Sequence, residues 1–154
     1  TGGHLIWQFS YQTGCIRSIA RPPFVKGFCL AVTHPGLEQL VGENNFTSPS
    51  ENQVQAITAH YLLEAKRSDG LPVDPVARFH LGNGAMIHAV HAGADVSDNG
   101  MAQSNGAMVN YLYDLSSIAS NHEQFITNKT VVASSEVRAQ SATVRSQFEE
   151  LHHG

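Results

Sequence analysis

The sequence predicts one domain of the α/β class (α+β), in which helices pack on a mixed sheet. Short apolar segments bounded by glycine and proline alternate with longer segments of helical periodicity. A length of 154 residues fits a single domain, residues 1–154. Hydrophobic residues make up 42% of the chain and charged residues 14%, which indicates a packed core and argues against disorder.

The first predicted elements lie around a turn-rich segment that covers residues 1–49. Residues 5–9 and 28–32 are short, apolar and predicted to be strands. Pro22-Pro23 excludes a helix between them, because neither proline nitrogen can donate a hydrogen bond. A helix should follow, since Ser50 and Gln53 have the spacing of a capping box. An apolar stripe marks its buried face at Val54, Ile57, Tyr61 and Ala65.

The second half alternates between extended and helical patterns. Residues 71–73 and 76–81 are expected to be extended, because Pro75 disfavours helical geometry at Asp74. Gly82-Asn83-Gly84 then forms a turn. The remaining elements are two strands and two helices, expected at residues 85–91, 107–115, 118–126 and 131–151.

The charge distribution suggests what the chain binds. Residues 1–37 contain Arg17, Arg21 and Lys26 and no acidic residue. Three cations without acids suit a compact anion such as a phosphorylated cofactor, and a solvated face is the equally open alternative. A nucleic-acid-binding protein would show a denser basic stripe. No apolar run reaches the roughly 20 residues that span a bilayer. We therefore expect neither a nucleic-acid nor a membrane partner.

The cysteines and histidines predict neither a disulfide framework nor a metal site. Cys15 and Cys29 form no C-x-x-C motif and are expected to be reduced thiols in a cytoplasmic protein. No secretory signal pattern is visible at the start of the sequence. Among nine histidines, His88 and His91 are three apart, but on a strand they would point to opposite faces. No thiolate or carboxylate pattern with zinc spacing surrounds them.

His80 is the histidine best placed for chemistry. It follows the predicted extended run and directly precedes the glycine-rich turn, a position that ligands can approach. An ordinary histidine pKa of about 6.5 suits proton transfer at neutral pH. On spacing alone, a structural histidine that caps the turn is the more frequent alternative.

Several ordered motifs resemble the signature region of malonyl-CoA decarboxylases, over residues 51–140. They are Asp74-Pro-Val-Ala-Arg-Phe-His-Leu-Gly-Asn-Gly-Ala85, Ala94-Asp-Val-Ser97, Met108-Val-Asn-Tyr-Leu-Tyr-Asp-Leu115, Asn121-His-Glu123 and Val131-Val-Ala-Ser-Ser-Glu-Val137. The resemblance implies a GNAT acetyltransferase-like fold that binds acyl-CoA. It also implies decarboxylation of malonyl-CoA to acetyl-CoA and carbon dioxide, without a metal or other cofactor. In a eukaryotic cell, it makes the mitochondrial matrix or the peroxisome the expected compartment.

The resemblance also implies roles for individual residues. His80, in the Phe-His-Leu motif, falls on the family's proton donor, and Tyr113, in the Asn-Tyr-x-Tyr motif, is placed beside it. Thr33, shortly before Pro35-Gly36, falls on the hydroxyl that contacts the malonyl carboxylate. Asn83 and Asn110 are candidates for positioning substrate, with turn formation and a strand-edge contact as their respective alternatives.

Residues 1–49 depart from the family pattern. Residues 14–20 resemble its glycine-rich turn, whose backbone amides bind the pyrophosphate of CoA, but Pro22-Pro23 stands where the helix should begin. The resemblance does not extend to the family's helical N-terminal domain, which serves oligomerisation. A homo-oligomer is nevertheless one expected assembly. The rival hypothesis is a non-catalytic acyl-CoA-binding or interaction remnant of the same fold. A metal-dependent hydrolase ranks third.

Overall fold

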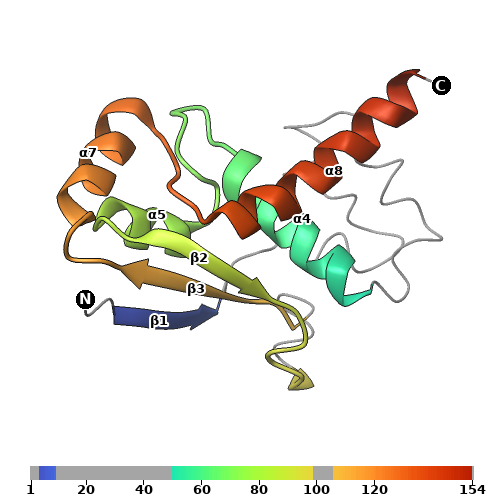
Figure 1. Ribbon diagram of the computed structural model, residues 1–154, viewed down its shortest axis with the longest axis horizontal. Coiled ribbons are helices and arrows are strands. Elements are labelled where there is room, and N and C mark those ends of the chain that lie inside the picture. The colour runs from blue at the N-terminus through green and yellow to red at the C-terminus, as the bar shows by residue number, and fades with distance from the viewer. Residues whose placement is uncertain (1–3, 10–49, 99–105, 154) are drawn as a thin grey trace.

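A computed structural model describes residues 4–9, 50–98 and 106–153, with side chains over 50–98 and 106–146 (Figure 1). Seven elements lie in these ranges: β1 (His4–Phe9), α4 (Glu51–Glu64), α5 (Pro75–Gly82), β2 (Met86–His91), β3 (Met108–Tyr113), α7 (Ile118–Asn128) and α8 (Ser135–His153). The predicted α/β class is confirmed. The strand expected at residues 28–32 lies outside the described residues.

The described strands form an antiparallel sheet in the order β1-β3-β2. β3 is therefore the central strand, paired with β1 on one side and with β2 on the other. The register of β2 shifts between Ile87 and Ala89, where a bulge leaves His88 exposed and turns both Ile87 and Val90 toward the core. A parallel bridge between Ile87 and Ala133 adds a segment beyond β2.

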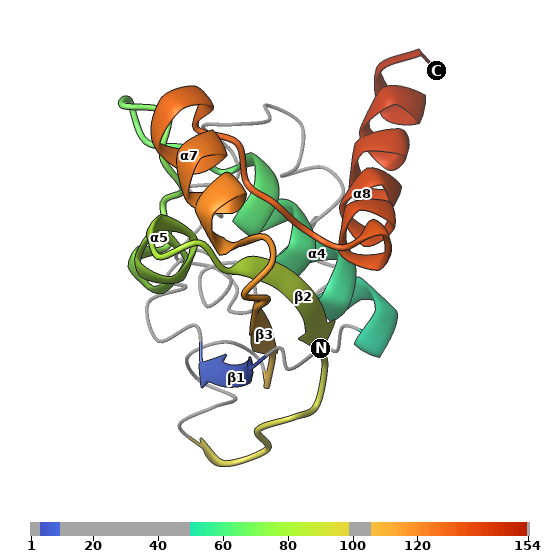
Figure 2. The same ribbon diagram turned by 60° about the vertical axis from the view of Figure 1, so that its left-hand side comes forward.

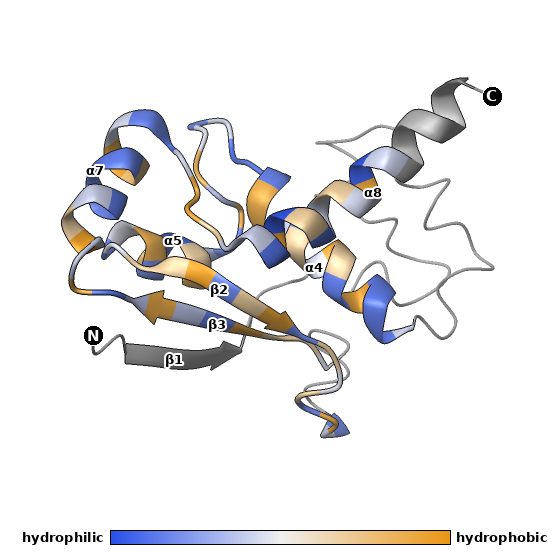
Figure 3. Cartoon of the chain, viewed as in Figure 1, coloured by the Kyte–Doolittle hydropathy of each residue, from blue (hydrophilic) through white to orange (hydrophobic). Residues whose placement is uncertain are grey.

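The helices cover one face of the sheet in two pairs (Figures 1 and 2). α4 packs against α8, and both contact β2. α5 packs against α7 at the other end of the sheet and also contacts β2. The core is built from residues of these helices and the sheet, whose ribbons carry both hydrophobic and hydrophilic segments (Figure 3). Within the described residues, no helix is both long and apolar enough to cross a membrane.

The N-terminus of α4 confirms the capping-box prediction. The Ser50 hydroxyl accepts a hydrogen bond from the Gln53 amide at 3.2 Å, and the Gln53 side chain accepts one from the Ser50 amide at 2.8 Å. The predicted apolar stripe is buried, from Val54 at 7% exposed to Ala65, the C-cap, at 0%. Both the start of α4 and its buried face therefore agree with the prediction from its sequence.

The segment after α4 differs from its predicted structure. Residues 76–81, predicted to be extended, form most of helix α5. Pro75 does hold Asp74 in extended geometry, with ψ at 120°, but Asp74 is the N-cap and its carboxylate accepts a 2.8 Å hydrogen bond from the Ala77 amide. Proline is compatible with the first helical position, where its missing N–H has no partner to lose. The same residue pair therefore opens a helix.

The last helix begins later than predicted. Residues 131–134 were expected to be helical but lie beside β2, where the Ile87 amide donates to Val132 and the Ser134 amide donates to Ile87. Two consecutive β-branched valines favour this extended geometry. Ser134 then caps α8, because its hydroxyl accepts from the Val137 amide at 3.2 Å.

Candidate active site

His80 lies in the last turn of α5 and faces the central strand of the sheet. Its side chain is 4% exposed, and its Nδ1 lies 2.7 Å from the hydroxyl oxygen of Tyr113 on β3. The structure thus brings together the two side chains that the family resemblance places side by side. The extended run expected to carry His80 is instead helix α5, which brings His80 to the strand.

Aromatic rings surround the imidazole of His80. The Tyr111 ring stacks on it, with centroids 4.4 Å apart and planes inclined by 20°. The rings of Tyr113 and Phe79 meet it edge-on, at 5.8 Å and 5.2 Å. Tyr111 and Tyr113 share a face of β3 because they are two residues apart on a strand. An alternation of tyrosines along one strand therefore builds two sides of the site.

Burial sets the protonation state of the His80–Tyr113 pair. Desolvation lowers the pKa of His80 below its ordinary value, and the negative charge of Asp74 opposes this shift in part. Burial also raises the pKa of the Tyr113 hydroxyl. Both groups are therefore neutral at pH 7 in the unliganded protein. A neutral imidazole and a phenol can share their hydrogen bond in either direction, with either group as donor.

The negative charge of Asp74 acts on His80 and also on two further tyrosines. Tyr61 and Tyr111 are each 1% exposed, and burial raises the pKa of both hydroxyls. The Asp74 charge raises both pKa values further. Neither hydroxyl has a hydrogen-bond partner among the described residues. Sequence reasoning did not single out Asp74 or Tyr111. The signals were the Asp-Pro pair that opens a helix and the period of two in Tyr111-Leu112-Tyr113.

The turn after His80 holds its backbone in place. The His80 carbonyl accepts hydrogen bonds from the amides of Asn83 and Ala85, at 3.1 Å and 3.0 Å. Asn83 is the C-cap of α5 and donates from its side chain to the Phe79 carbonyl at 2.8 Å. Of its two predicted roles, turn formation is thus present in the structure, and substrate positioning stays a prediction.

Helix α7 clamps this turn from outside. Gly84 has a φ of +89°, and a Cβ there would lie 2.5 Å from the Ile118 carbonyl oxygen, so only glycine fits. The side-chain amide of Asn121 donates from Nδ2 to the Gly84 carbonyl at 3.1 Å, and Nδ1 of His122 lies 2.7 Å from the Gly82 carbonyl oxygen. Asn121 and His122 belong to a motif quoted above, but their contact with this turn was not predicted. It joins residues about forty positions apart.

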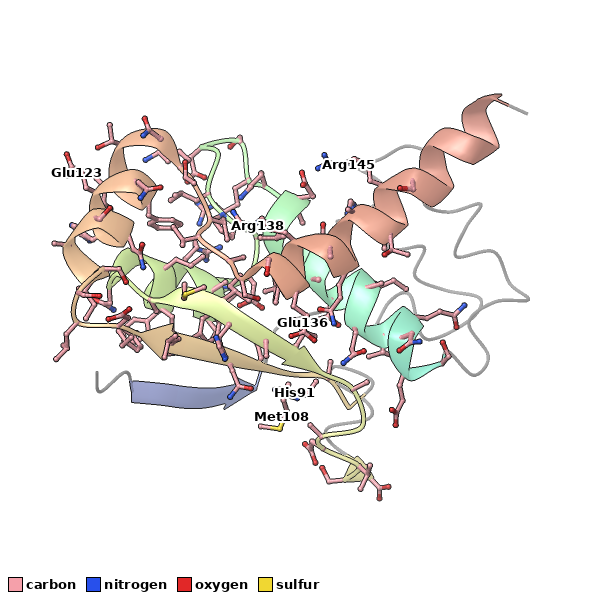
Figure 4. The ribbon with its side chains drawn as sticks, in the orientation of Figure 1. His91, Met108, Glu123, Glu136, Arg138 and Arg145 are labelled. Atoms are coloured by element: carbon pink, nitrogen blue, oxygen red, sulfur yellow. The ribbon has the colours of Figure 1, made fainter. Side chains whose placement is uncertain are left out.

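Asn110 lies outside the His80 site. It precedes Tyr111 on β3, so its side chain points to the opposite face of the sheet. It is 1% exposed and its Oδ1 bonds to Nε2 of His91, whose side chain lies on the side of the sheet away from α8 (Figure 4). The alternative of a strand-edge contact is wrong, because β3 is the central strand.

The remaining predicted site residues are not in the described part of the chain. Thr33, Arg17, Arg21 and Lys26 lie outside the described residues, as do both cysteines. Over residues 50–98 and 106–146, no group of three or more His, Cys, Asp or Glu side chains is arranged to hold a metal ion.

Comparisons with known proteins point to one family. The malonyl-CoA decarboxylase C-terminal domain family matches residues 36–152. Mitochondrial malonyl-CoA decarboxylase of Rattus norvegicus is 30% identical over 119 residues, which are 73% of this chain and 24% of that protein. The Mus musculus protein of the same name is 33% identical over 97 residues, 63% of this chain and 20% of that protein. The chain thus spans about a quarter or less of these curated relatives.

Solved structures of malonyl-CoA decarboxylases are similar to this chain. The Rhodopseudomonas palustris structure has a TM-score of 0.57 and 44% identity, over 68% of this chain and 25% of that one. The Cupriavidus metallidurans structure has a TM-score of 0.66 and 27% identity, over 90% of this chain and 38% of that one.

Proposed function

Because the chain belongs to the malonyl-CoA decarboxylase C-terminal domain family, we propose that it carries the site that decarboxylates malonyl-CoA, with His80 as general acid. The products are acetyl-CoA and carbon dioxide. The observation that carries this proposal is the His80–Tyr113 pair, in which a buried histidine and a half-buried tyrosine are joined at 2.7 Å across two elements. It supplies a proton donor whose side chain is 4% exposed, and a proton donor is what the second half of the reaction needs.

The reaction divides into two steps. First, the bond between the α-carbon and the carboxylate breaks, carbon dioxide leaves, and the electron pair passes into a thioester enolate. Second, a proton from His80 forms a new C–H bond at the α-carbon. In the unliganded protein the imidazole is neutral, but the negative charge of bound malonyl-CoA raises its pKa and favours uptake of a proton. The imidazolium then stabilises the enolate before it gives up that proton.

Tyr113 sets the direction of proton transfer in this proposal. When His80 is protonated, Nδ1–H donates to the Tyr113 oxygen. The proton transferred to the α-carbon then comes from Nε2, while Nδ1 keeps its proton and its hydrogen bond to the Tyr113 oxygen. The burial that raises the pKa of Tyr113 keeps its hydroxyl neutral, so it orients the ring and does not take its proton.

Other predicted residues take supporting roles in binding the substrate. Thr33 would hold the malonyl carboxylate out of the thioester plane, where the breaking bond overlaps the carbonyl system. Arg17, Arg21 and Lys26 would bind the phosphates of CoA. Asn83 keeps its candidate role beside His80. Asn110, on the other face of the sheet, would reach only a part of the thioester remote from the reacting carbon.

The proposal needs no cofactor beyond the CoA thioester itself. A homo-oligomer and a cytoplasmic location remain predictions. The curated relatives above are named as mitochondrial proteins, so the mitochondrial matrix remains the alternative compartment.

Incubation with malonyl-CoA in deuterated water tests the proposed reaction. We expect acetyl-CoA that carries one deuteron on its methyl group, because the enolate takes its last proton from a solvent-exchangeable donor. If no acetyl-CoA forms but calorimetry detects acetyl-CoA binding, the non-catalytic acyl-CoA-binding alternative holds. If neither turnover nor binding is detected, both proposals fail.

A further inference from the structure

We propose that Tyr111 is a positioning residue for His80, because its ring stacks on the imidazole and fixes the plane of that ring. The inference rests on the proposed function, since it explains how the general acid is held for proton transfer. It concerns a residue that neither the motif resemblance nor the charge pattern marks as functional.

The hydrogen bond to Tyr113 does not fix the imidazole by itself. The contact at Nδ1, 2.7 Å from the Tyr113 oxygen, holds one edge of the ring and does not by itself define the tilt of its plane. The stacked ring of Tyr111, 4.4 Å away and inclined by 20°, packs against the face of the imidazole and limits that tilt. One tyrosine therefore fixes an atom of His80, and the other fixes its plane.

Tyr111 is well held for this task. It lies in the middle of the central strand, opposite Ile6 on β1 and Ile87 on β2, and is 1% exposed. A fully buried side chain in a close-packed core cannot move without its neighbours. The backbone of His80 is equally constrained by the turn that α7 clamps. Two rigid elements thus bring the rings together.

The ring of Tyr111, and not its hydroxyl, carries this role. The hydroxyl has no hydrogen-bond partner among the described residues, so its removal breaks no bond in that part of the chain. Tyr61 offers a matched control. It is equally buried, its hydroxyl also lacks a described partner, and the Asp74 charge acts on it too. Within the described residues, however, the rings in contact with His80 are those of Phe79, Tyr111 and Tyr113.

Kinetics of four variants test the inference. Tyr111→Leu should lower kcat for malonyl-CoA roughly 10- to 100-fold, because a small misplacement of a catalytic group has effects of this size. KM should change little. Tyr111→Phe, which keeps the stack, should restore kcat. Tyr61→Phe and Tyr61→Leu should keep kcat near the wild-type value. If Tyr111→Leu keeps its kcat, or if Tyr61→Leu loses as much, the inference is wrong.

A measurement without turnover separates this inference from the proposed function. In histidine NMR spectra, the carbon-bound ring protons of His80 should be shifted upfield by the stacked tyrosine in the wild-type protein and in Tyr111→Phe. Their absence from an upfield position in the wild type would overturn the inference, even if Tyr111→Leu fails to fold. An upfield position in a protein that does not turn over malonyl-CoA would support the stack and refute the proposed reaction.

Discussion

The two helix pairs on the sheet are held by different kinds of contact. α4 and α8 pack along their lengths, with side-chain contacts between them at the buried Ser141–His60 pair, 3.4 Å apart, and at the Glu64–Arg145 ion pair. α5 and α7 meet around a turn, where side chains of α7 bond to backbone carbonyls after His80. The first kind of contact joins side chains to side chains. The second fixes the position of a particular backbone segment.

This difference explains why the sequence predicted α4 but not the contact between α7 and the turn after His80. The capping box of α4 and its stripe from Val54 to Ala65 depend on neighbours within the same helix, so local spacing reveals them. Asn121 acts on Gly84, 37 residues away, and no local pattern signals such a contact. Its motif was noticed only through the family resemblance.

The errors have the same origin. The Asp74-Pro75 pair fits both a strand end and a helix start, and the packing of α5 against the sheet and α7 decides between them. Residues 131–134 continue into a helical pattern, but the free edge of β2 binds them as an extended segment. Tyr113 beside His80 was predicted because the family resemblance places the two motifs that carry these residues at one site. The stacked Tyr111 was not, because burial alone would also explain it.

Gly84→Ala should have the largest effect on stability. A non-glycine residue at this positive φ costs about 1–3 kcal/mol, and the overlap with Ile118 costs about 1–3 kcal/mol more. Gly82→Ala is the matched control, since a Cβ there meets the Phe125 ring at 3.8 Å, an ordinary contact. Urea unfolding measures both. Equal stability of the two variants would show that α7 does not clamp the turn.

Leu62→Ala should separate stability from activity. Removal of this fully buried side chain between α4 and the core should lower the free energy of unfolding by about 2–5 kcal/mol. Because Leu62 lies in the other helix pair, kcat per folded molecule should stay near the wild-type value. Denaturant unfolding and turnover at low temperature provide the two numbers. A kcat that falls together with stability would remove the proposed distinction between the pairs.

Asn121→Ala should show the reverse pattern. Loss of its bond leaves the buried Gly84 carbonyl unpaired, which costs about 1–3 kcal/mol. We expect kcat to fall while most of the protein stays folded, because the turn that holds the His80 carbonyl loosens. Exposed Glu123→Ala on the same helix is the control. Unchanged kcat in Asn121→Ala would mean that the turn needs no clamp.

The pH dependence of stability should be the smallest of these effects. Burial lowers the pKa of His80 in the folded state. As the pH falls below about 6.5, His80 therefore becomes protonated in the unfolded chain before it does in the folded chain. This contribution therefore favours folding above that pH and is lost as the pH falls toward the folded-state pKa. His80→Gln should flatten the curve of unfolding free energy between these two values. An identical curve would show that His80 titrates normally.

The most direct test of the central claim is turnover by His80→Ala beside His88→Ala. His88 is an exposed histidine on β2, so its variant controls for the loss of a histidine as such. We expect His80→Ala to lose about 10²–10⁴-fold in kcat, because it removes the general acid. Its acetyl-CoA affinity should stay near that of the wild type, its melting temperature should stay above the assay temperature, and His88→Ala should keep full activity. His80→Ala that retains more than about half of the wild-type kcat would contradict the assignment of His80 as the proton donor, since general acid catalysis is worth far more than twofold.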